Sequence, residues 1–178
     1  MKKIILMTAA IFLLMTSSAF AAQNSQGIGV IIVGGAEFKT SDYYKIIKSE
    51  VKPASGSKIV FGNDLQTLYK KYWLQRGYIG EQMPQKEDLI NFTNMSGCEK
   101  IICLIISDAV VDKHNSSNHR EKVRISVQLD AYICTKTDVV DVFSANEEED
   151  SKGSDLRARR GAFQKCLKEI CKTLNTDI

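Results

Sequence analysis

The residues with the clearest capacity to bind a metal ion are Asp112, His114 and His119, which share one polar stretch. Imidazole nitrogens and carboxylate oxygens are zinc ligands, and a bound zinc ion can activate water for hydrolysis. A firm site needs three or four ligands that converge, and residues of a polar loop converge only if the loop folds around the ion. We therefore expect a solvated loop, with no metal and no cofactor. A metal-assisted hydrolase that uses these three residues is the alternative.

Other motifs that carry chemistry are absent from the sequence. It contains no Gly-x-Ser-x-Gly nucleophile turn and no Cys-x-x-Cys pair. The glycines at positions 27, 29, 34 and 35 lack the Gly-x-Gly-x-x-Gly spacing of a dinucleotide loop. The acidic run 147–150 lacks the alternating oxygen ligands and the glycine of a calcium loop. The sequence therefore predicts a protein that binds a partner and is not an enzyme.

Five cysteines remain outside the amino-terminal segment, and each is expected to be a small core residue. An odd number leaves at least one thiol without a partner in the same chain. Cys103 and Cys134 fall on strands that could be neighbours, so a bridge between them is a hypothesis. Cys166 and Cys171 are roughly 140° apart around one helix and should not pair. The pairing pattern, which also involves Cys98, stays open.

The first 21 residues are typical of a secretory signal peptide. Lys2 and Lys3 form a positive head, an apolar run follows over residues 4–15, and Ala19 and Ala21 are the small residues of a cleavage site. The apolar run is shorter than the roughly 20 residues of a membrane span. No cysteine stands at the cleavage point, so a lipid anchor is not expected. We predict an exported, soluble protein, periplasmic or extracellular.

The remaining residues, 22–178, are predicted to form one α/β domain with its core at about 27–174. Without Lys2 and Lys3 the balance is 22 basic and 21 acidic residues. Such a near-neutral domain has no general attraction for nucleic acid. No stretch in 22–178 is apolar and long enough to span a membrane.

Hydrophobic periodicity predicts elements in the order β-α-β-α-α-β-β-β-α. The predicted strands cover residues 27–33, 58–61, 100–107, 123–134 and 139–144. The predicted helices cover residues 41–51, 63–77 including the caps Asn63 and Gly77, 85–95 and 155–174. Strands separated by helices are usually parallel neighbours, and the late hairpin adds an antiparallel pair. The result is a mixed sheet of about five strands with helices mainly on one face. Stretches 112–121 and 146–154 are predicted to be loops.

Three surfaces are candidates for binding. Apolar residues alternate with polar ones along 123–133, and the polar set forms what we call the contact face: Arg124, Ser126, Gln128, Asp130 and Tyr132. The last helix should turn Leu156, Phe163, Leu167, Ile170 and Leu174 inward. Its outer side then carries a basic stripe that could touch an anionic surface or could be an ordinary solvated face: Arg157, Lys165, Lys168 and Lys172. A small-molecule pocket could form near Tyr69, Trp73 and Tyr78, although core packing also explains these aromatics.

The second half of the chain carries a resemblance. A helix that ends in Ser96-Gly97-Cys98-Glu99 leads into strand 100–107, and the hairpin 123–144, an acidic segment and a closing helix follow. This order resembles the periplasmic α/β domain shared by the TolB amino-terminal domain, the curli-secretion lipoprotein CsgG and related cell-envelope lipoproteins. It covers about residues 27–174 and assigns no functional residue.

The resemblance has two departures. The chain lacks the lipobox cysteine, and nothing in it resembles the membrane-inserting hairpins of the secretion pore. What the resemblance implies is a non-enzymatic envelope module that binds another envelope protein or associates with itself.

Overall fold

The computed structural model describes residues 27–53, 57–60, 62–80, 82–115 and 121–177. The predicted signal peptide and its cleavage site lie outside these residues. The described elements are β1 (Gly27–Val33), the 3-10 turn η1 (Ala36–Phe38), α2 (Ser41–Glu50), β2 (Lys58–Val60), α3 (Asn63–Gln75), α4 (Lys86–Ser96), β3 (Lys100–Asn115), β4 (Glu121–Thr135), β5 (Val139–Lys152) and α5 (Asp155–Asp177).

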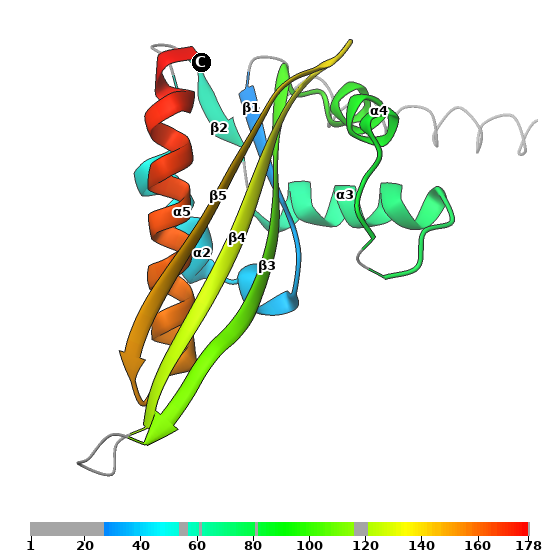
Figure 1. Cartoon of the computed structure of the whole chain (residues 1–178). Coiled ribbons are helices and arrows are strands. Elements are labelled where there is room, and N and C mark those ends of the chain that lie inside the picture. The colour runs from blue at the N-terminus through cyan, green and yellow to red at the C-terminus, as the bar shows by residue number, and fades with distance from the viewer. Residues whose placement is uncertain (1–26, 54–56, 61, 81, 116–120, 178) are drawn as a thin grey trace, which may run out of the picture.

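The strands form one sheet in the order β2-β1-β3-β4-β5 (Figure 1). β1 pairs in parallel with β2 and β3, whereas β3, β4 and β5 are antiparallel to one another. The connections explain these directions. Parallel neighbours need a long crossover connection, and helices separate β1, β2 and β3 along the chain. A short turn joins β4 to β5, which makes these two strands antiparallel. The predicted α/β class with a five-stranded mixed sheet is confirmed.

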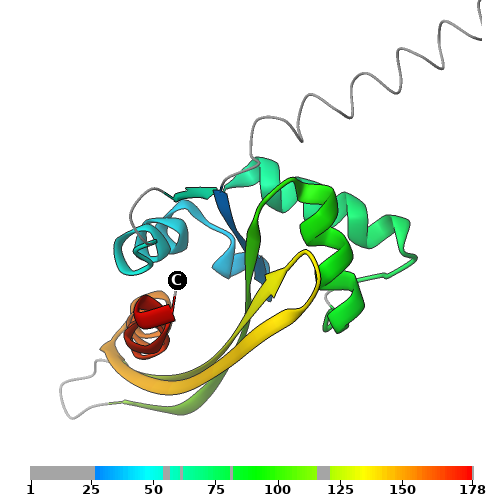
Figure 2. The ribbon, with the colours of Figure 1, turned by 90° about the horizontal axis from the view of Figure 1, so that it is seen from above.

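Helices lie on both sides of this sheet (Figure 2). β1 is buried along its whole length, as its continuous apolar run predicts. Its side chains alternate between two cores: Val30 and Ile32 pack with α2 and α5, and Ile31 and Val33 pack with α3 and α4. α5 runs along the long β4–β5 hairpin, whereas α3 and α4 cover only the end near β1. Beyond α4, the hairpin is therefore covered on one face only.

Two predicted loops are largely strand. β3 continues to Asn115 and β4 begins at Glu121, so only residues 116–120 of the predicted polar loop lie outside the described strands. β5 continues through the acidic run to Lys152. Acidic residues are uncommon in strands, but β-propensity is easily overridden by pairing with a neighbouring strand. Here Glu149 lies opposite Ile125 of β4, and the acidic run is part of the ladder.

Helix ends follow the predicted caps with one shift. Gly77 and Gly97 adopt the left-handed conformation, with φ of 81° and 74°, that closes α3 and α4. Asn63, predicted to be a cap, is already the first residue of α3, and Gly62 is the cap. No described helix has the length and apolar character to cross a bilayer.

The prediction that Leu156 points inward is wrong, since its side chain is 48% exposed. The small residues Ala158 and Ala162 are fully buried in its place and allow the first turns of α5 to approach the sheet closely. Phe163, Leu167 and Ile170 are buried as predicted. The side chain of Leu174 lies outside the described part.

All five cysteines are buried free thiols. Cys103 lies opposite Tyr132 and Cys134 lies opposite Ile101, so the two cysteines are offset by two residue pairs along the ladder. The hypothesised Cys103–Cys134 bridge is not formed. Burial raises the pKa of Cys134 to about 12 and keeps this thiol protonated at neutral pH.

Gly29 gives a test of the packing between β1 and β3. A Cβ at this position would lie 2.4 Å from Ile101 Cδ1 and 2.9 Å from Cys98 Sγ. We expect Gly29→Ala to lower the free energy of unfolding by about 1–3 kcal/mol because the core has no room for the added methyl group. Urea denaturation followed by circular dichroism measures it.

Gly161→Ala is the matched control for that substitution. Its Cβ would lie 2.7 Å from Glu149 Cγ, so the Glu149 side chain must shift, but alanine favours a helix by about 1 kcal/mol over glycine and offsets part of this cost. We expect a smaller loss of stability than in Gly29→Ala. Equal losses in the two variants would contradict the packing argument.

Candidate functional site

The contact face lies on β4 at the centre of the hairpin, on the side away from α5. Arg124 and Gln128 are exposed, and Ser126, Asp130 and Tyr132 are half-buried. The alternating apolar residues on the other side are fully buried against α5: Val123, Ile125, Val127 and Leu129. The structure thus brings the five predicted residues together on one surface.

Cross-strand contacts order the Arg124 end of this face. Arg124 donates from Nε to Asp150 Oδ1 (2.7 Å) and from Nη2 to Asp150 Oδ2 (3.2 Å). Ser126 Oγ lies 2.8 Å from Asn146 Oδ1 and donates to it. The hydrogen bond to Asp150 raises the pKa of Arg124. An exposed pair of this kind adds little to stability, so its main effect is to hold the side chain in one position.

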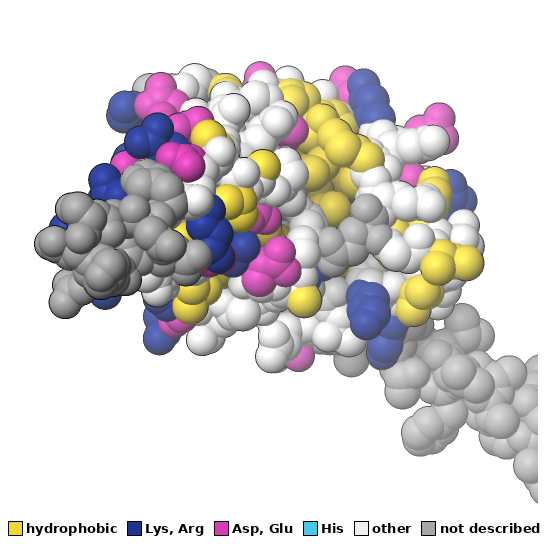
Figure 3. Space-filling view, turned by 60° about the horizontal axis from the view of Figure 1, so that its bottom comes forward, with side chains coloured by type: hydrophobic (Ala, Val, Ile, Leu, Met, Phe, Trp, Pro, Cys, Tyr) yellow, Lys and Arg dark blue, Asp and Glu magenta, His cyan; other side chains and the backbone are white. Residues whose placement is uncertain are grey.

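Charge around the sheet is mixed in sign. Figure 3 shows Lys and Arg side chains interspersed with Asp and Glu, and hydrophobic side chains grouped between them. The basic stripe of α5 is exposed as predicted, but acids accompany it. Lys165 binds Glu149 at 2.6 Å and Lys172 binds Glu169 at 3.0 Å. These carboxylates offset much of the positive charge that would attract an anionic surface.

A second candidate site is a cavity of about 460 Å³ at the carboxyl end of β1. It contains the predicted aromatic group: Trp73 stacks on Tyr69 with ring centres 5.6 Å apart and on Tyr78 at 4.1 Å. The cavity lies between β1, η1, α2, α3 and the loop after α3. Its lining also includes Ile32, Val33, Ala36, Lys39, Tyr44, Asn63, Gln66, Thr67, Lys70, Leu74, Gly80 and Gln82.

Gln66 seals the edge of β1 beside this cavity. β2 pairs with β1 only as far as Gly29. Further along β1, the side-chain amide of Gln66 makes the hydrogen bonds that a neighbouring strand would make. Ile32 N–H donates to Gln66 Oε1 (3.0 Å), and Gln66 Nε2 donates to the Ile32 carbonyl (2.8 Å). The backbone groups of this buried residue are therefore satisfied next to an open cavity.

Asp88 holds the loop that forms the cavity wall. Its buried carboxylate accepts hydrogen bonds from Arg76 Nε (3.1 Å) and Tyr78 Oη (3.0 Å). It also accepts from the Gln85 N–H (3.3 Å) at the start of α4. The bond to Asp88 raises the pKa of Tyr78, because the phenol must keep its proton to donate. This network was not predicted from the sequence, although Gln85 and Asp88 have the three-residue spacing of a capping box.

The metal hypothesis stays a prediction. Asp112 lies on β3 opposite Arg124. The side chain of His114 and the whole of His119 lie outside the described part of the chain. Within that part, no three His, Cys, Asp or Glu residues are grouped as metal ligands.

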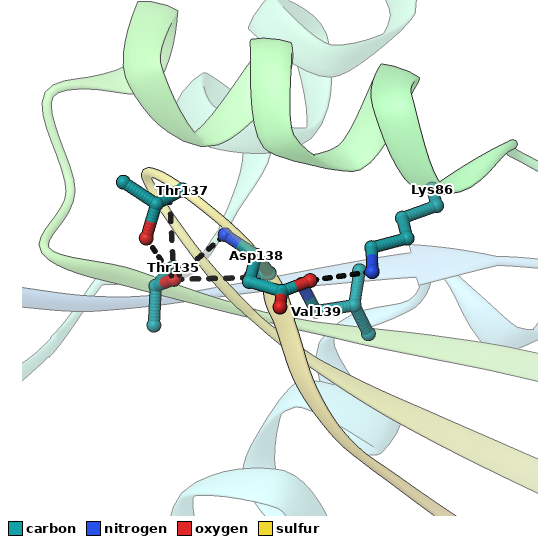
Figure 4. Close-up of polar contacts among 5 residues, drawn as sticks. All are labelled: Lys86, Thr135, Thr137, Asp138 and Val139. Atoms are coloured by element: carbon teal, nitrogen blue, oxygen red, sulfur yellow. Dashed lines mark hydrogen bonds and ion pairs between the residues drawn. The ribbon is translucent and has the colours of Figure 1, made fainter.

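The turn between β4 and β5 is tightly bonded (Figure 4). Thr135 Oγ1 accepts from the Asp138 N–H (3.1 Å) and donates to the Asp138 carbonyl (3.0 Å). Lys86, at the first position of α4, binds the Asp138 carboxylate at 2.5 Å and lowers its pKa. Asn94 of α4 donates to the carbonyl of Lys136. These contacts fix the start of β5 against α4.

No protein-family model and no curated protein matches the chain. Solved structures to which it is similar include a neuraminyllactose-binding hemagglutinin homologue from Helicobacter pylori, with 12% identity, 86% of this chain and 83% of that chain covered, and a TM-score of 0.38. The PelC dodecamer from Paraburkholderia phytofirmans has 6% identity, coverages of 82% and 84%, and a TM-score of 0.39. Lipoprotein GNA1162 from Neisseria meningitidis has 8% identity, coverages of 85% and 99%, and a TM-score of 0.40.

Such distant likenesses carry no argument about function. The neighbours include bacterial lipoproteins. The more specific resemblance to TolB and CsgG is not established by them.

Asp88 can be tested through the only tryptophan of the chain, Trp73, which donates to the Gly80 carbonyl in the same loop (3.2 Å). We expect Asp88→Ala to lower the free energy of unfolding by about 1–3 kcal/mol, because the buried Tyr72 hydroxyl (3.4 Å), Arg76 and Tyr78 lose their shared acceptor. Trp73 fluorescence should shift to the red as the loop opens to water. Glu87→Ala is the control, because Glu87 is exposed in the same turn of α4. It should change neither the free energy of unfolding nor the Trp73 fluorescence.

Proposed function

We propose that this chain is an exported, non-enzymatic binding module of the cell envelope, soluble and not lipid-anchored, that holds a protein partner on the contact face. The observation that carries the proposal is that this face is ordered and that no described helix covers its part at 124–128, whereas Tyr132 packs partly against the core under α3 and α4. Arg124 and Ser126 are already positioned by Asp150 and Asn146. A partner therefore meets a surface whose side chains lose little further freedom on binding.

The chemistry of the surface favours a protein partner. Arg and Tyr often dominate binding energy at protein interfaces, and Arg124 and Tyr132 stand at the two ends of the contact face. The exposed Val142 lies opposite Tyr132 on β5 and adds apolar area at that end. The contact face has a polar centre, charges of both signs and an apolar end. Such a surface fits a folded protein better than a polyanion, which would need a patch of positive charge.

The contact face can be tested by substitution. We expect joint replacement of Arg124, Gln128 and Tyr132 by alanine to reduce partner capture from envelope extract by about tenfold, because Arg and Tyr contacts are lost together. Quantitative mass spectrometry of the captured protein measures the effect, and circular dichroism checks the fold. Lys48→Ala with Lys71→Ala, both exposed on helices, is the matched control. Undiminished capture by a folded triple variant would remove the contact face from the proposal.

A second candidate function is a small-molecule carrier, and the cavity at the end of β1 favours it. Mainly apolar walls with a few polar groups are typical of ligand pockets, and the volume of about 460 Å³ suits a small ligand. Lys39 and Lys70 at the lining would prefer an apolar ligand that carries an anionic group.

The carrier hypothesis can be tested with 1-anilinonaphthalene-8-sulfonate, an apolar anion. We expect it to quench Trp73, and Thr67→Phe to weaken its binding by about tenfold because the added ring fills the cavity. Lys71→Phe, which adds the same ring on α3 outside the lining, should bind as the parent does. Equal binding by both variants would place the probe elsewhere.

A further inference from the structure

The cavity at the end of β1 is elongated along one face of α3. Its lining residues on this helix recur at helical spacing and include Asn63, Gln66, Thr67, Lys70, Trp73 and Leu74. At a rise of about 1.5 Å per residue, Asn63 and Leu74 lie about 16 Å apart along the helix axis. A cavity of this length suits an extended chain better than a compact ring.

The walls of the cavity suit an alkyl chain. Trp73 and the rings stacked on it, Tyr69 and Tyr78, form an aromatic side. Both backbone groups of Ile32 are already bonded to Gln66, so a peptide strand cannot pair with β1 there. The backbone of a peptide would therefore lie unpaired against apolar walls, at a cost that an alkyl chain does not have.

A second hollow, of about 530 Å³, adjoins the cavity at the amino end of α3, and we call it the lysine hollow. The two share Lys39, Tyr44 and Asn63 as lining residues, and the lysine hollow also contains Lys45. Lys45 is exposed, and its contact with Asp42 is long, at 3.9 Å. α2 and α3 both begin at this hollow, and the first turn of a helix adds partial positive charge. Positive charge therefore gathers at one end of the cavity.

The other end of the cavity is apolar. Leu74 lines it there and is exposed, and the loop that forms the wall at this end carries the exposed Ile79 and Met83. Lys70, between the two ends, is exposed as well, so its ammonium group can stay in water while its stem covers the chain. A ligand that fits the whole site is therefore anionic at one end and apolar along the rest.

We propose that the cavity and the lysine hollow together bind a single-chain amphiphile, a fatty acid or a ligand of the same chemistry. The alkyl chain lies along α3, and the anionic group lies at Lys39 and Lys45. This inference rests on the carrier function proposed above, for which it names the ligand class. The cavity volume of about 460 Å³ is toward the small end of the range for ligand pockets, so it admits one chain.

Chain length tests the place of the alkyl chain. We expect octanoate, decanoate and dodecanoate to quench Trp73, the only tryptophan of the chain. Each step in length should tighten binding by at least about tenfold, because it buries two more methylene groups. Titration of Trp73 fluorescence measures the dissociation constants. Thr67→Phe, whose ring blocks the cavity, should reduce this gain with length, whereas Lys71→Phe should keep it.

Removal of charge tests the lysine hollow. We expect the joint variant Lys39→Gln with Lys45→Gln to weaken decanoate binding by about tenfold and to leave unchanged the binding of decanol, which has the same chain length and no charge. Lys52→Gln with Lys58→Gln is the control, because both lysines are exposed and lie outside the two linings. Decanoate should bind to this control as it does to the unaltered chain. Thermal unfolding verifies the fold of each variant.

A salt titration of the unaltered chain gives a second measurement that needs no substitution. Added salt screens the lysines, so it should weaken the binding of decanoate relative to that of decanol.

The outcomes separate this inference from the carrier function. If neither decanoate nor decanol binds, the carrier function and this inference both fall. If both ligands bind but salt and the lysine variant change neither, the carrier function stands and the anionic class is overturned. A folded lysine variant that loses both ligands equally overturns it too, as does a series of acids whose binding does not depend on chain length.

Discussion

The pairing of β3 with strands on both of its sides holds the two halves of this fold together. Along one side, residues 100–105 pair in parallel with β1, and along the other side β3 runs antiparallel to β4 for its whole length. Its side chains alternate between the core under α5 and the core under α3 and α4. Because β3 outruns β1, the hairpin β4–β5 extends past the parallel part of the sheet. Arg124, Ser126 and Gln128 of the contact face belong to this extension, whereas Tyr132 and the exposed Val142 lie level with Cys103, beside the parallel part.

The sequence predicted the parts of the fold that depend on burial. The apolar runs at 27–33 and 100–107 and the alternation at 123–133 leave little choice of structure, since each matches a strand covered on two faces or one. The extents of β3 and β5 were not predictable in the same way. Residues 147–150 are poor strand formers by composition, and their strand depends on β4, with Arg124 and Lys165 to match the charge. Such long-range pairing leaves no local pattern to read.

The two candidate sites also differ in whether a local sequence pattern could predict them. The contact face follows from a period of two within one strand, so residue spacing alone could group its five residues. The cavity depends on parts that are distant in sequence: Gln66 bonds to Ile32, 34 residues away, and Asp88 bonds to Arg76, 12 residues away. Aromatic spacing on α3 indicated where a pocket could lie, but the groups that keep it open become visible only once β1, α3 and α4 are assembled. For the cysteines, the sequence predicted that Cys103 and Cys134 lie on neighbouring strands, but it could not predict their offset of two residue pairs.

Electrostatics within β5 link these observations. An acidic run on an edge strand is costly unless cations neutralise it, and here Arg124 supplies one from the contact face while Lys165 supplies another from α5. The same charges therefore order the contact face and attach α5 to the hairpin. The first half of β5 needs no such neutralisation, because its residues are mostly uncharged and its turn is fixed by α4.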